Sequence, residues 1–331
     1  MGKKEDVLKA LSDQMVLPVI AAPMFLVSNP ELVTACCRNG VIGSFPAPNA
    51  RTIEQLEEWM IQITTSLEEH AGSGQKTAPW ALNMVTHRTY SRLPEEVELI
   101  LRYQPQIVIT ALGSPSTVIE AVHSYGGLVF ADVNSVKFAK KSAQTGVDGL
   151  ILVSSGAGGH TGNMNSFAFV EAVRQFFDGL IILAGGISTG NGILAAQSLG
   201  ADLAYMGTSF ISTSESMAQV EYKEMVVEAE FDDIVMTDAF TGVHANMLRP
   251  SIEKAGLDPE KLKPKATINF SDPQAGTKAW KNIWSAGHGI ESVTNIQPAA
   301  DIIAQLEEQY QEAQKRLSQK NYWNMLKEEI K

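Results

Sequence analysis

The apolar run Gly149-Leu150-Ile151-Leu152-Val153 is followed by the loop Ser154-Ser155-Gly156-Ala157-Gly158-Gly159-His160-Thr161-Gly162-Asn163. The run has the length and branching of a fully buried β-strand. Four glycines within residues 156–162 predict a loop whose backbone takes positive φ angles and comes close to a bound group. His160 is the one side chain of this loop that can transfer a proton near neutral pH, so a candidate acid or base lies at the carboxyl end of a strand. Taken alone, the same loop also fits a tight turn with a surface histidine.

The composition restricts the class of protein. The chain has 331 residues, of which 44% are hydrophobic, and a formal net charge of −11. No cluster of Lys and Arg accompanies this acidic balance, so we expect neither a nucleic-acid partner nor an anionic-membrane partner. No apolar run approaches a membrane span, and the amino terminus lacks the apolar core of a signal peptide. The two cysteines, Cys36 and Cys37, are adjacent and cannot form a disulfide framework, which predicts a cytoplasmic protein.

Strand-like runs alternate with amphipathic helical stretches eight times within about 200 residues, which predicts an α/β fold of the (β/α)8 TIM-barrel class. A doubly wound open sheet is the alternative, but no Gly-rich dinucleotide turn follows an early strand. The predicted strands are residues 17–22, 41–45, 80–85, 107–112, 127–133, 149–153, 180–184 and 203–206.

The chain changes character after the eighth predicted strand. Residues 215–230 predict a long helix, and the irregular sequence that follows contains four prolines. The amphipathic pattern of residues 298–329 predicts a helical end that packs on the barrel or on a second subunit. We therefore expect a barrel over residues 1–215, a smaller substrate lobe over residues 216–297, and C-terminal helices over residues 298–331.

Two further glycine turns follow the seventh and eighth predicted strands, at Gly185-Gly186 and at Gly207-Thr208. In barrels these two positions often bind phosphate through backbone N–H groups. The strand ends carry no lysine suited to a Schiff base, no paired carboxylates, and no set of residues with metal-ligand spacing, so we expect no metal. With these kinds of site excluded, the remaining interpretations are flavin chemistry and binding of a phosphorylated metabolite. Asp132, near the end of the fifth strand, is interpreted either as a functional carboxylate or as a helix cap.

Several motifs occur in the order typical of the nitronate monooxygenase family, formerly called the 2-nitropropane dioxygenases, and the chain resembles that family from about Leu17 to Leu306. The motifs are Val19-Ile20-Ala21-Ala22-Pro23-Met24, Ala157-Gly158-Gly159-His160-Thr161-Gly162, Leu183-Ala184-Gly185-Gly186-Ile187, Met206-Gly207-Thr208-Ser209-Phe210 and Thr213-Ser214-Glu215-Ser216. The resemblance continues through Tyr222-Lys223, Ala239-Phe240-Thr241-Gly242 and Ser285-Ala286-Gly287-His288-Gly289.

This resemblance implies an FMN-dependent barrel enzyme in which His160 matches the active-site histidine, as a base on the carbon acid or as a group that orients its anion. The backbone around Ala22, Pro23 and Met24 would lie along the isoalloxazine ring, and the Asn83 amide would hydrogen-bond to it. The chain has Ser155 where many members have Gln, so that flavin contact would fall to the Ser155 hydroxyl or to the backbone, or be lost. The arginine usual after Gly-Thr is Ser209 here. The residues expected at the ring edge and phosphate are Gly158, Gly159, Gly185, Gly186, Tyr205, Met206, Gly207 and Thr208.

The implied reaction is oxidation of an alkyl nitronate with O₂ as oxidant, which gives a carbonyl compound and nitrite. One alternative is an FMN- and NAD(P)H-dependent enoyl-acyl-carrier-protein reductase, an enoyl-thioester reductase that shares the Gly-Gly-His loop. A second alternative is a non-catalytic flavin-binding subunit. All three interpretations predict a flavoprotein that binds small molecules, with a homodimer as one possible assembly.

Overall fold

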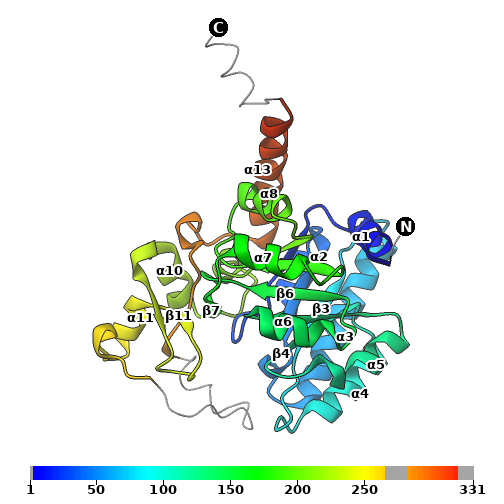
Figure 1. The fold of residues 1–331 in the computed structure, drawn as a ribbon, viewed down its shortest axis with the longest axis horizontal. Coiled ribbons are helices and arrows are strands. Elements are labelled where there is room, and N and C mark those ends of the chain that lie inside the picture. Colours follow the sequence, from blue (N-terminus) through cyan, green and yellow to red (C-terminus); the bar gives the residue numbers. More distant parts are fainter. Residues whose placement is uncertain (1–2, 265–281, 320–331) are drawn as a thin grey trace.

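The computed structural model describes residues 3–264 and 282–319, and eight parallel strands form its centre (Figure 1). Both boundaries of every strand lie within two residues of the predicted ones, and the first strand is shorter at both ends than predicted. The strands are β1 (Val19–Ala21), β2 (Gly43–Pro46), β3 (Trp80–Val85), β4 (Ile107–Ala111), β5 (Leu128–Val133), β6 (Gly149–Val153), β8 (Leu180–Ala184) and β9 (Leu203–Met206).

The sheet closes on itself. Its strand order is β1-β9-β8-β6-β5-β4-β3-β2, and a parallel bridge between Ile20 and Ile42 joins the two ends. The Ala21 N–H donates to the Ile42 carbonyl at 2.8 Å, and the Ile42 N–H donates to the Val19 carbonyl at 3.0 Å. The predicted (β/α)8 barrel is therefore confirmed.

Helices follow the strands and cover the outside of the barrel. Several begin at the cap residues that the sequence indicates: the side chains of Asn29, Thr52 and Thr189 accept N–H groups of the first turn of α2, α3 and α8. The helices of this layer are α2 (Pro30–Arg38), α3 (Ile53–Gly72), α4 (Leu93–Tyr103), α5 (Ile119–Ser124), α6 (Val136–Ala143), α7 (Ser166–Arg174), α8 (Gly190–Ser198) and the short α9 (Thr208–Ile211), with 3-10 turns at 47–49 and 115–117.

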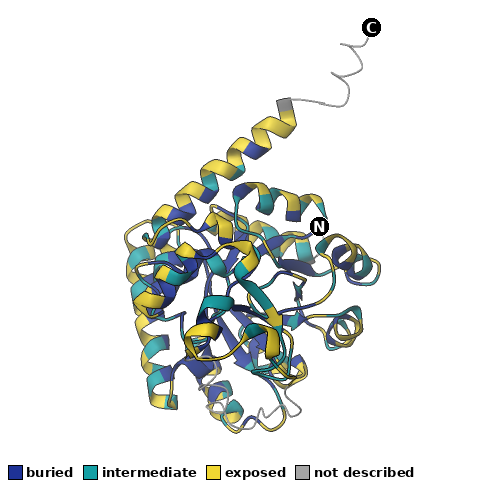
Figure 2. Cartoon of the chain, turned by 90° about the vertical axis from the view of Figure 1, so that its left-hand side faces the viewer, coloured by how far each residue is buried: buried dark blue, intermediate teal, exposed yellow. Residues whose placement is uncertain are grey.

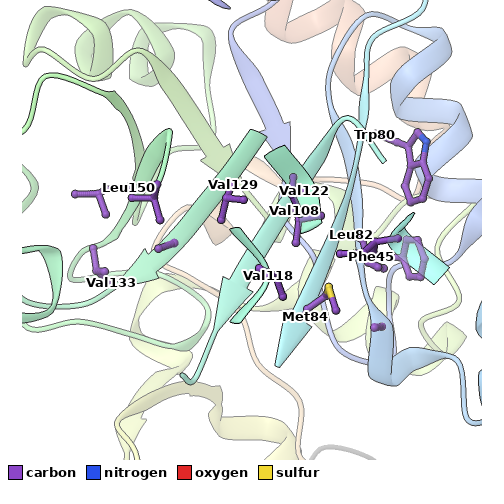
Figure 3. Close-up of a cluster of buried hydrophobic side chains, with 14 of the residues drawn as sticks. Phe45, Trp80, Leu82, Met84, Val108, Val118, Val122, Val129, Val133 and Leu150 are labelled. Carbon is purple, nitrogen blue, oxygen red and sulfur yellow. The ribbon is translucent and has the colours of Figure 1, made fainter. Parts of the chain in front are cut away.

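Apolar side chains fill both faces of the strands. Side chains that point outward from the strands pack under the helices, where Phe45 stacks on Trp80 with ring centroids 6.2 Å apart (Figure 3). The side chains that point inward form a separate cluster that includes Ile109, Phe130 and Ile182. Such two-sided burial explains why the strands read as continuous apolar runs instead of alternating ones.

An amino-terminal helix that the sequence did not predict, α1 (Lys3–Gln14), packs against this inward-facing cluster. Leu11 is buried there together with Ile107 and Leu180, the first residues of β4 and β8. The Lys4 ammonium also contacts the Asp202 carboxylate at 2.8 Å. Helix α1 therefore closes the amino-terminal end of the barrel, opposite the end where the glycine turns lie.

The segment after β9 forms a lobe on one side of the barrel (Figure 1). It contains helices α10 (Val220–Glu228) and α11 (Arg249–Lys254), strands β10 (Ile234–Thr237) and β11 (Ala245–Leu248), and 3-10 turns at 231–233, 259–261 and 290–292. The predicted long helix over residues 215–230 is wrong in its first part. Residues before Val220 make other bonds instead: the Ser216 N–H donates locally to Thr213 Oγ1 at 3.2 Å, and the Glu215 carboxylate accepts the N–H of Ala299 at the start of the last described helix.

The last described helix, α13 (Ala299–Gln319), packs on α8 and α2, and its outer half extends away from the body (Figures 1 and 2). The Gly190 N–H donates to Gln309 Oε1 at 2.9 Å. A Cβ at Gly190 would lie 2.2 Å from the Tyr310 nitrogen, so glycine permits this close approach. The predicted continuation of this helix to residue 329 lies outside the described residues. None of the described helices has the length and apolar character needed to cross a bilayer.

The burial of α1 predicts a stability effect. Replacement Leu11→Ala should lower the free energy of unfolding by about 2–4 kcal/mol, because it removes buried methyl groups and leaves a cavity at the barrel end. Urea denaturation measures this change. The exposed Lys9→Ala on the same helix is the control and should change stability by less than about 0.5 kcal/mol. Equal effects of the two substitutions would contradict the assigned role of α1.

Candidate active site

Three glycine turns meet at the carboxyl-terminal mouth of the barrel, and the segment Ser285–Gly289 crosses them. The Gly287 N–H donates to Thr208 Oγ1 after β9, and the His288 N–H donates to the Gly156 carbonyl after β6, both at 2.9 Å. A Cβ at Gly289 would lie 2.6 Å from the Cβ of Ser188, which follows the turn after β8. The structure therefore brings the turns together, through a segment more than 75 residues later in the chain than Thr208.

Two positions in these turns require glycine, because neighbouring atoms leave no room for a Cβ. A Cβ at Gly158 would lie 2.8 Å from the Gly287 nitrogen. Gly185 has φ +123°, and a Cβ there would lie 2.3 Å from Ser154 Oγ. Any larger residue at either position would therefore push the crossing segment or the turn after β6 away from the mouth.

Backbone N–H groups remain available at this rim. Gly158 and Gly186 are exposed although they lie between packed elements. Within residues 3–264 and 282–319, no backbone carbonyl accepts the N–H of Gly186 or Gly207. Free N–H groups on adjacent turns can together bind an anion.

The turn after β1 lies beside this rim. The Ala22 N–H donates to the Met206 carbonyl at 2.9 Å, and the sulfur of Met24 lies 3.4 Å from the position of a Cβ at Gly207. Two side chains hold this turn in place: the Met24 N–H donates to Ser28 Oγ, and the Met24 carbonyl accepts from Asn49 Nδ2, both at 3.0 Å. Ala22, Pro23 and Met24 thus form a fixed edge of the mouth.

Asn83 occupies an inward-facing position of β3 and is 8% exposed. Its Nδ2 donates to the Ile109 carbonyl at 3.5 Å, the upper limit for a hydrogen bond. The amide therefore has most of its hydrogen-bonding capacity left for a ligand.

His160 lies in a strand and not in a free loop as predicted. Residues Gly159–His160 form β7, the edge of a three-stranded antiparallel sheet with β10 and β11 of the lobe. His160 is paired with Ala245, and the Thr161 N–H donates to the His244 carbonyl at 3.0 Å. The lobe therefore fixes the backbone of the histidine relative to the mouth.

Asn246 supports the same loop, and the sequence did not single it out. It is 2% exposed, and its Nδ2 donates to the Ala157 carbonyl at 2.8 Å. Its position on a four-residue strand carries no local pattern that indicates contact with a loop almost 90 residues earlier, so only the fold reveals it.

Burial lowers the pKa of His160 to about 4. The imidazole is therefore neutral at pH 7 and can accept a proton or a hydrogen bond.

A second histidine, His288, lies against Gly156, and its ring meets Phe231 edge-on with centroids 4.8 Å apart. Partial burial lowers its pKa as well. His244, by contrast, is exposed on the hairpin between β10 and β11.

Two other polar groups lie among the apolar side chains inside the barrel. Asp132 Oδ1 and the Tyr205 hydroxyl are buried and have no hydrogen-bond partner among the described residues. Burial raises the pKa of Asp132 to about 7. The interpretation of Asp132 as a helix cap is wrong, because Ser135 Oγ accepts the Phe138 N–H at the start of α6.

The remaining predicted residues also lie at this rim. Ser155 is exposed, and its N–H donates to the Met164 carbonyl at 2.8 Å. Ser209 is buried, and its hydroxyl has no partner among the described residues. No group of three or more His, Cys, Asp or Glu that could hold a metal ion occurs in the described parts of the chain.

The family model for nitronate monooxygenase matches residues 7–309, which include the barrel, the crossing segment and the lobe. The chain belongs to the nitronate monooxygenase family. It is therefore an enzyme of a flavin-dependent oxidoreductase family, and the family resemblance noted in the sequence is confirmed.

Several known proteins are similar to this chain. A nitronate monooxygenase of Paraburkholderia phytofirmans is 25% identical, with 91% of this chain and 94% of that protein covered. A Rhodococcus jostii protein named (3aS,4S,5R,7aS)-5-hydroxy-7a-methyl-1-oxo-octahydro-1H-indene-4-carboxyl-CoA dehydrogenase is 26% identical, with 71% and 63% covered. The crystal structure of nitroalkane oxidase from Streptomyces ansochromogenes has the same fold, with a TM-score of 0.76, 24% identity, and 93% and 99% of the two chains covered.

The bond between Gly287 and Thr208 predicts a second stability effect. Replacement Thr208→Val should lower the free energy of unfolding by about 1–3 kcal/mol, because the Gly287 N–H loses its acceptor in a half-buried place. Thermal unfolding of the protein without added cofactor measures this. Thr208→Ser keeps the hydroxyl and should retain most of the stability, so a serine variant as unstable as the valine variant would show that the hydroxyl is not the stabilising group.

Proposed function

We propose that this family member is an FMN-dependent nitronate monooxygenase in which His160 faces the reacting carbon. The position of His160 carries the proposal: antiparallel pairing with Ala245 holds it at the mouth where the three glycine turns meet. The family assignment supports flavin chemistry, and the free N–H groups at the rim support a cofactor with a phosphate group.

The residues that would hold FMN have distinct roles. Gly186, Gly207 and Thr208 would bind the phosphate through N–H groups. The edge formed by Ala22, Pro23 and Met24 would lie along the ring, with Asn83 as a hydrogen-bonding partner. The remaining predicted contacts would come from backbone and side chains around the same mouth: Ser155, Gly158, Gly159, Gly185, Tyr205 and Met206. When bound, the flavin supplies the oxidation of the nitronate and its own reoxidation by O₂.

His160 would position the substrate and handle its proton. A neutral imidazole can remove the acidic proton of a nitroalkane, or accept a hydrogen bond from the substrate before reaction. The described residues of the lobe, 216–264 and 282–297, would complete the wall of the substrate pocket, because β11 lies directly beside β7. Two buried, free cysteines fit a reducing cytoplasm, in which we propose the enzyme works.

The test uses purified full-length protein loaded with FMN. We expect an alkyl nitronate to bleach the flavin band under anaerobic conditions, and O₂ to restore it with formation of nitrite. His160→Ala should slow the bleaching about 10²- to 10⁴-fold without loss of FMN. His70→Ala, on the outer helix α3, is the matched control and should react like the unaltered protein. Protein that binds no FMN, or that reacts at the same rate without His160, would refute the proposal.

The pKa of His160 predicts a pH profile. Because burial lowers this pKa to about 4, the imidazole stays neutral as the pH falls through 6.5, the ordinary value for histidine, and becomes protonated only near pH 4. The ratio of the bleaching rates of the unaltered protein and of His160→Ala should therefore stay constant from about pH 8 to 5.5 and decrease below that. This ratio cancels the titration of the substrate itself. A midpoint near 6.5 would show that His160 is not buried in the working enzyme.

A thioester substrate is the second candidate, and the carboxyl-CoA dehydrogenase of Rhodococcus jostii favours it. In that case NADH or NADPH should reduce the flavin, and an enoyl thioester such as crotonyl-CoA should reoxidise it. Nitronates would then leave the flavin band unchanged. The same anaerobic absorbance experiment therefore distinguishes the two candidate functions.

A further inference from the structure

Asp132 and Tyr205 carry two buried polar atoms that have no partner among the described residues, inside a barrel that is filled mainly by apolar side chains. Asp132 shares the inward-facing parity of Leu128 and Phe130 on β5, and it is the last such position of that strand. Tyr205 packs against the same inward-facing cluster from β9, next to the Gly207 turn. Both residues therefore lie at the end of the barrel where the candidate site lies.

These two side chains interact electrostatically, but no described residue provides a hydrogen-bond partner for Asp132 Oδ1 or for the Tyr205 hydroxyl. The Asp132 carboxyl lies close enough to raise the pKa of the Tyr205 hydroxyl, in addition to the larger effect of burial. A buried polar atom without a partner costs stability, and a functional role or a bound group that completes it is one reason for a protein to retain it.

The surroundings favour the uncharged acid. The inward-facing neighbours on the adjacent strands are apolar: Ile109 on β4, and Ile151 and Val153 on β6. Tyr205, on another strand, is the titratable group whose pKa the Asp132 carboxyl raises. The pKa of Asp132 itself is raised by burial alone. No described cation is near enough to stabilise a carboxylate there. The acid form brings one O–H donor to the mouth, and the tyrosine brings a second.

We propose that Asp132, in its acid form, and Tyr205 donate hydrogen bonds to the carbonyl-bearing edge of the FMN ring and so form the polar floor of the cofactor site. This inference rests on the proposed cofactor. The isoalloxazine edge offers carbonyl oxygens and a ring nitrogen as acceptors, which are the groups that two unpartnered donors require. Asn83, on the inner face of β3, would be the third polar side chain of this floor.

Asp132 is expected to weaken the fold when no flavin is bound. Its pKa is raised above the unfolded value of 3.8, so the folded state holds the proton more tightly, and this contribution to stability is lost as the pH rises from about 4 through 7. Asp132→Asn cannot ionise. In the absence of FMN it should therefore have a higher melting temperature than the unaltered protein at pH 8, and the gain should shrink at pH 5. The exposed Asp178→Asn is the control and should show no such gain.

The deciding experiment titrates the full-length chain with FMN at pH 6, 7, 8 and 9. For the unaltered protein, the dissociation constant should increase about tenfold over this range relative to Asp132→Asn, because ionisation removes the donor that the amide retains. Asp132→Leu should bind about tenfold more weakly at pH 6, and Tyr205→Phe should bind several-fold more weakly with the pH dependence of the unaltered protein.

The outcomes separate the two proposals. If the unaltered protein binds no FMN, the proposed function fails and this inference fails with it. If it binds FMN but Asp132→Asn and Asp132→Leu both match it at every pH, only the inference is overturned. Binding that tightens as the pH rises would also overturn it, since the carboxylate would then be the form in contact with the ring. The melting temperature of each protein, measured at each pH of the titration, shows whether a weaker affinity comes from loss of the folded state.

Discussion

The candidate site depends on the contact between residues 285–289 and the glycine turns of the barrel. Two hydrogen bonds make this contact: the Gly287 N–H donates to the Thr208 side-chain hydroxyl, and the His288 N–H donates to the Gly156 carbonyl. The segment is held equally firmly from the lobe: the Ser285 carbonyl accepts the Tyr222 hydroxyl, and the Trp284 N–H donates to Ser251 Oγ at 2.7 Å. Helices α10 and α11 therefore position the segment, and the segment positions the turns. The barrel supplies the rim, but the lobe fixes its shape.

Local sequence signals were sufficient for the barrel. Strands β6, β8 and β9 begin and end where the apolar runs predict, because both faces of each strand are buried and the glycine turns end the runs. Helix α1 could not be predicted in the same way. Its apolar residues are few, and their significance lies in the open end of the barrel that they cover. The prediction of a long helix after residue 215 failed because side-chain bonds of Thr213 and Glu215 compete with helical ones.

The candidate site could be predicted only in part from the sequence. Carboxyl ends of parallel strands meet at one end of a barrel, so turns far apart in the sequence could be expected to share a rim, and His160 could be expected to lie there. The pairing of His160 with Ala245 and the support from Asn246 could not be foreseen. A two-residue strand has no periodicity, and its existence depends entirely on a hairpin more than 80 residues later. The same holds for Asp132, whose lack of a partner is a property of the folded interior.

Burial gives the mouth an unusual electrostatic character. It lowers the pKa of His160 to about 4 and raises that of Asp132 to about 7, so the base and much of the acid are uncharged near neutral pH. The serine at position 209 adds no charge either. Under the proposed function, an anion at this rim would therefore be attracted mainly by backbone N–H groups, whose positions the barrel and the lobe fix before any ligand arrives. Such preorganised dipoles act at short range and are screened by salt less than exposed charges are. Under the proposed function, selection by this mouth would therefore rest on the shape and hydrogen-bonding pattern of the ligand more than on its net charge.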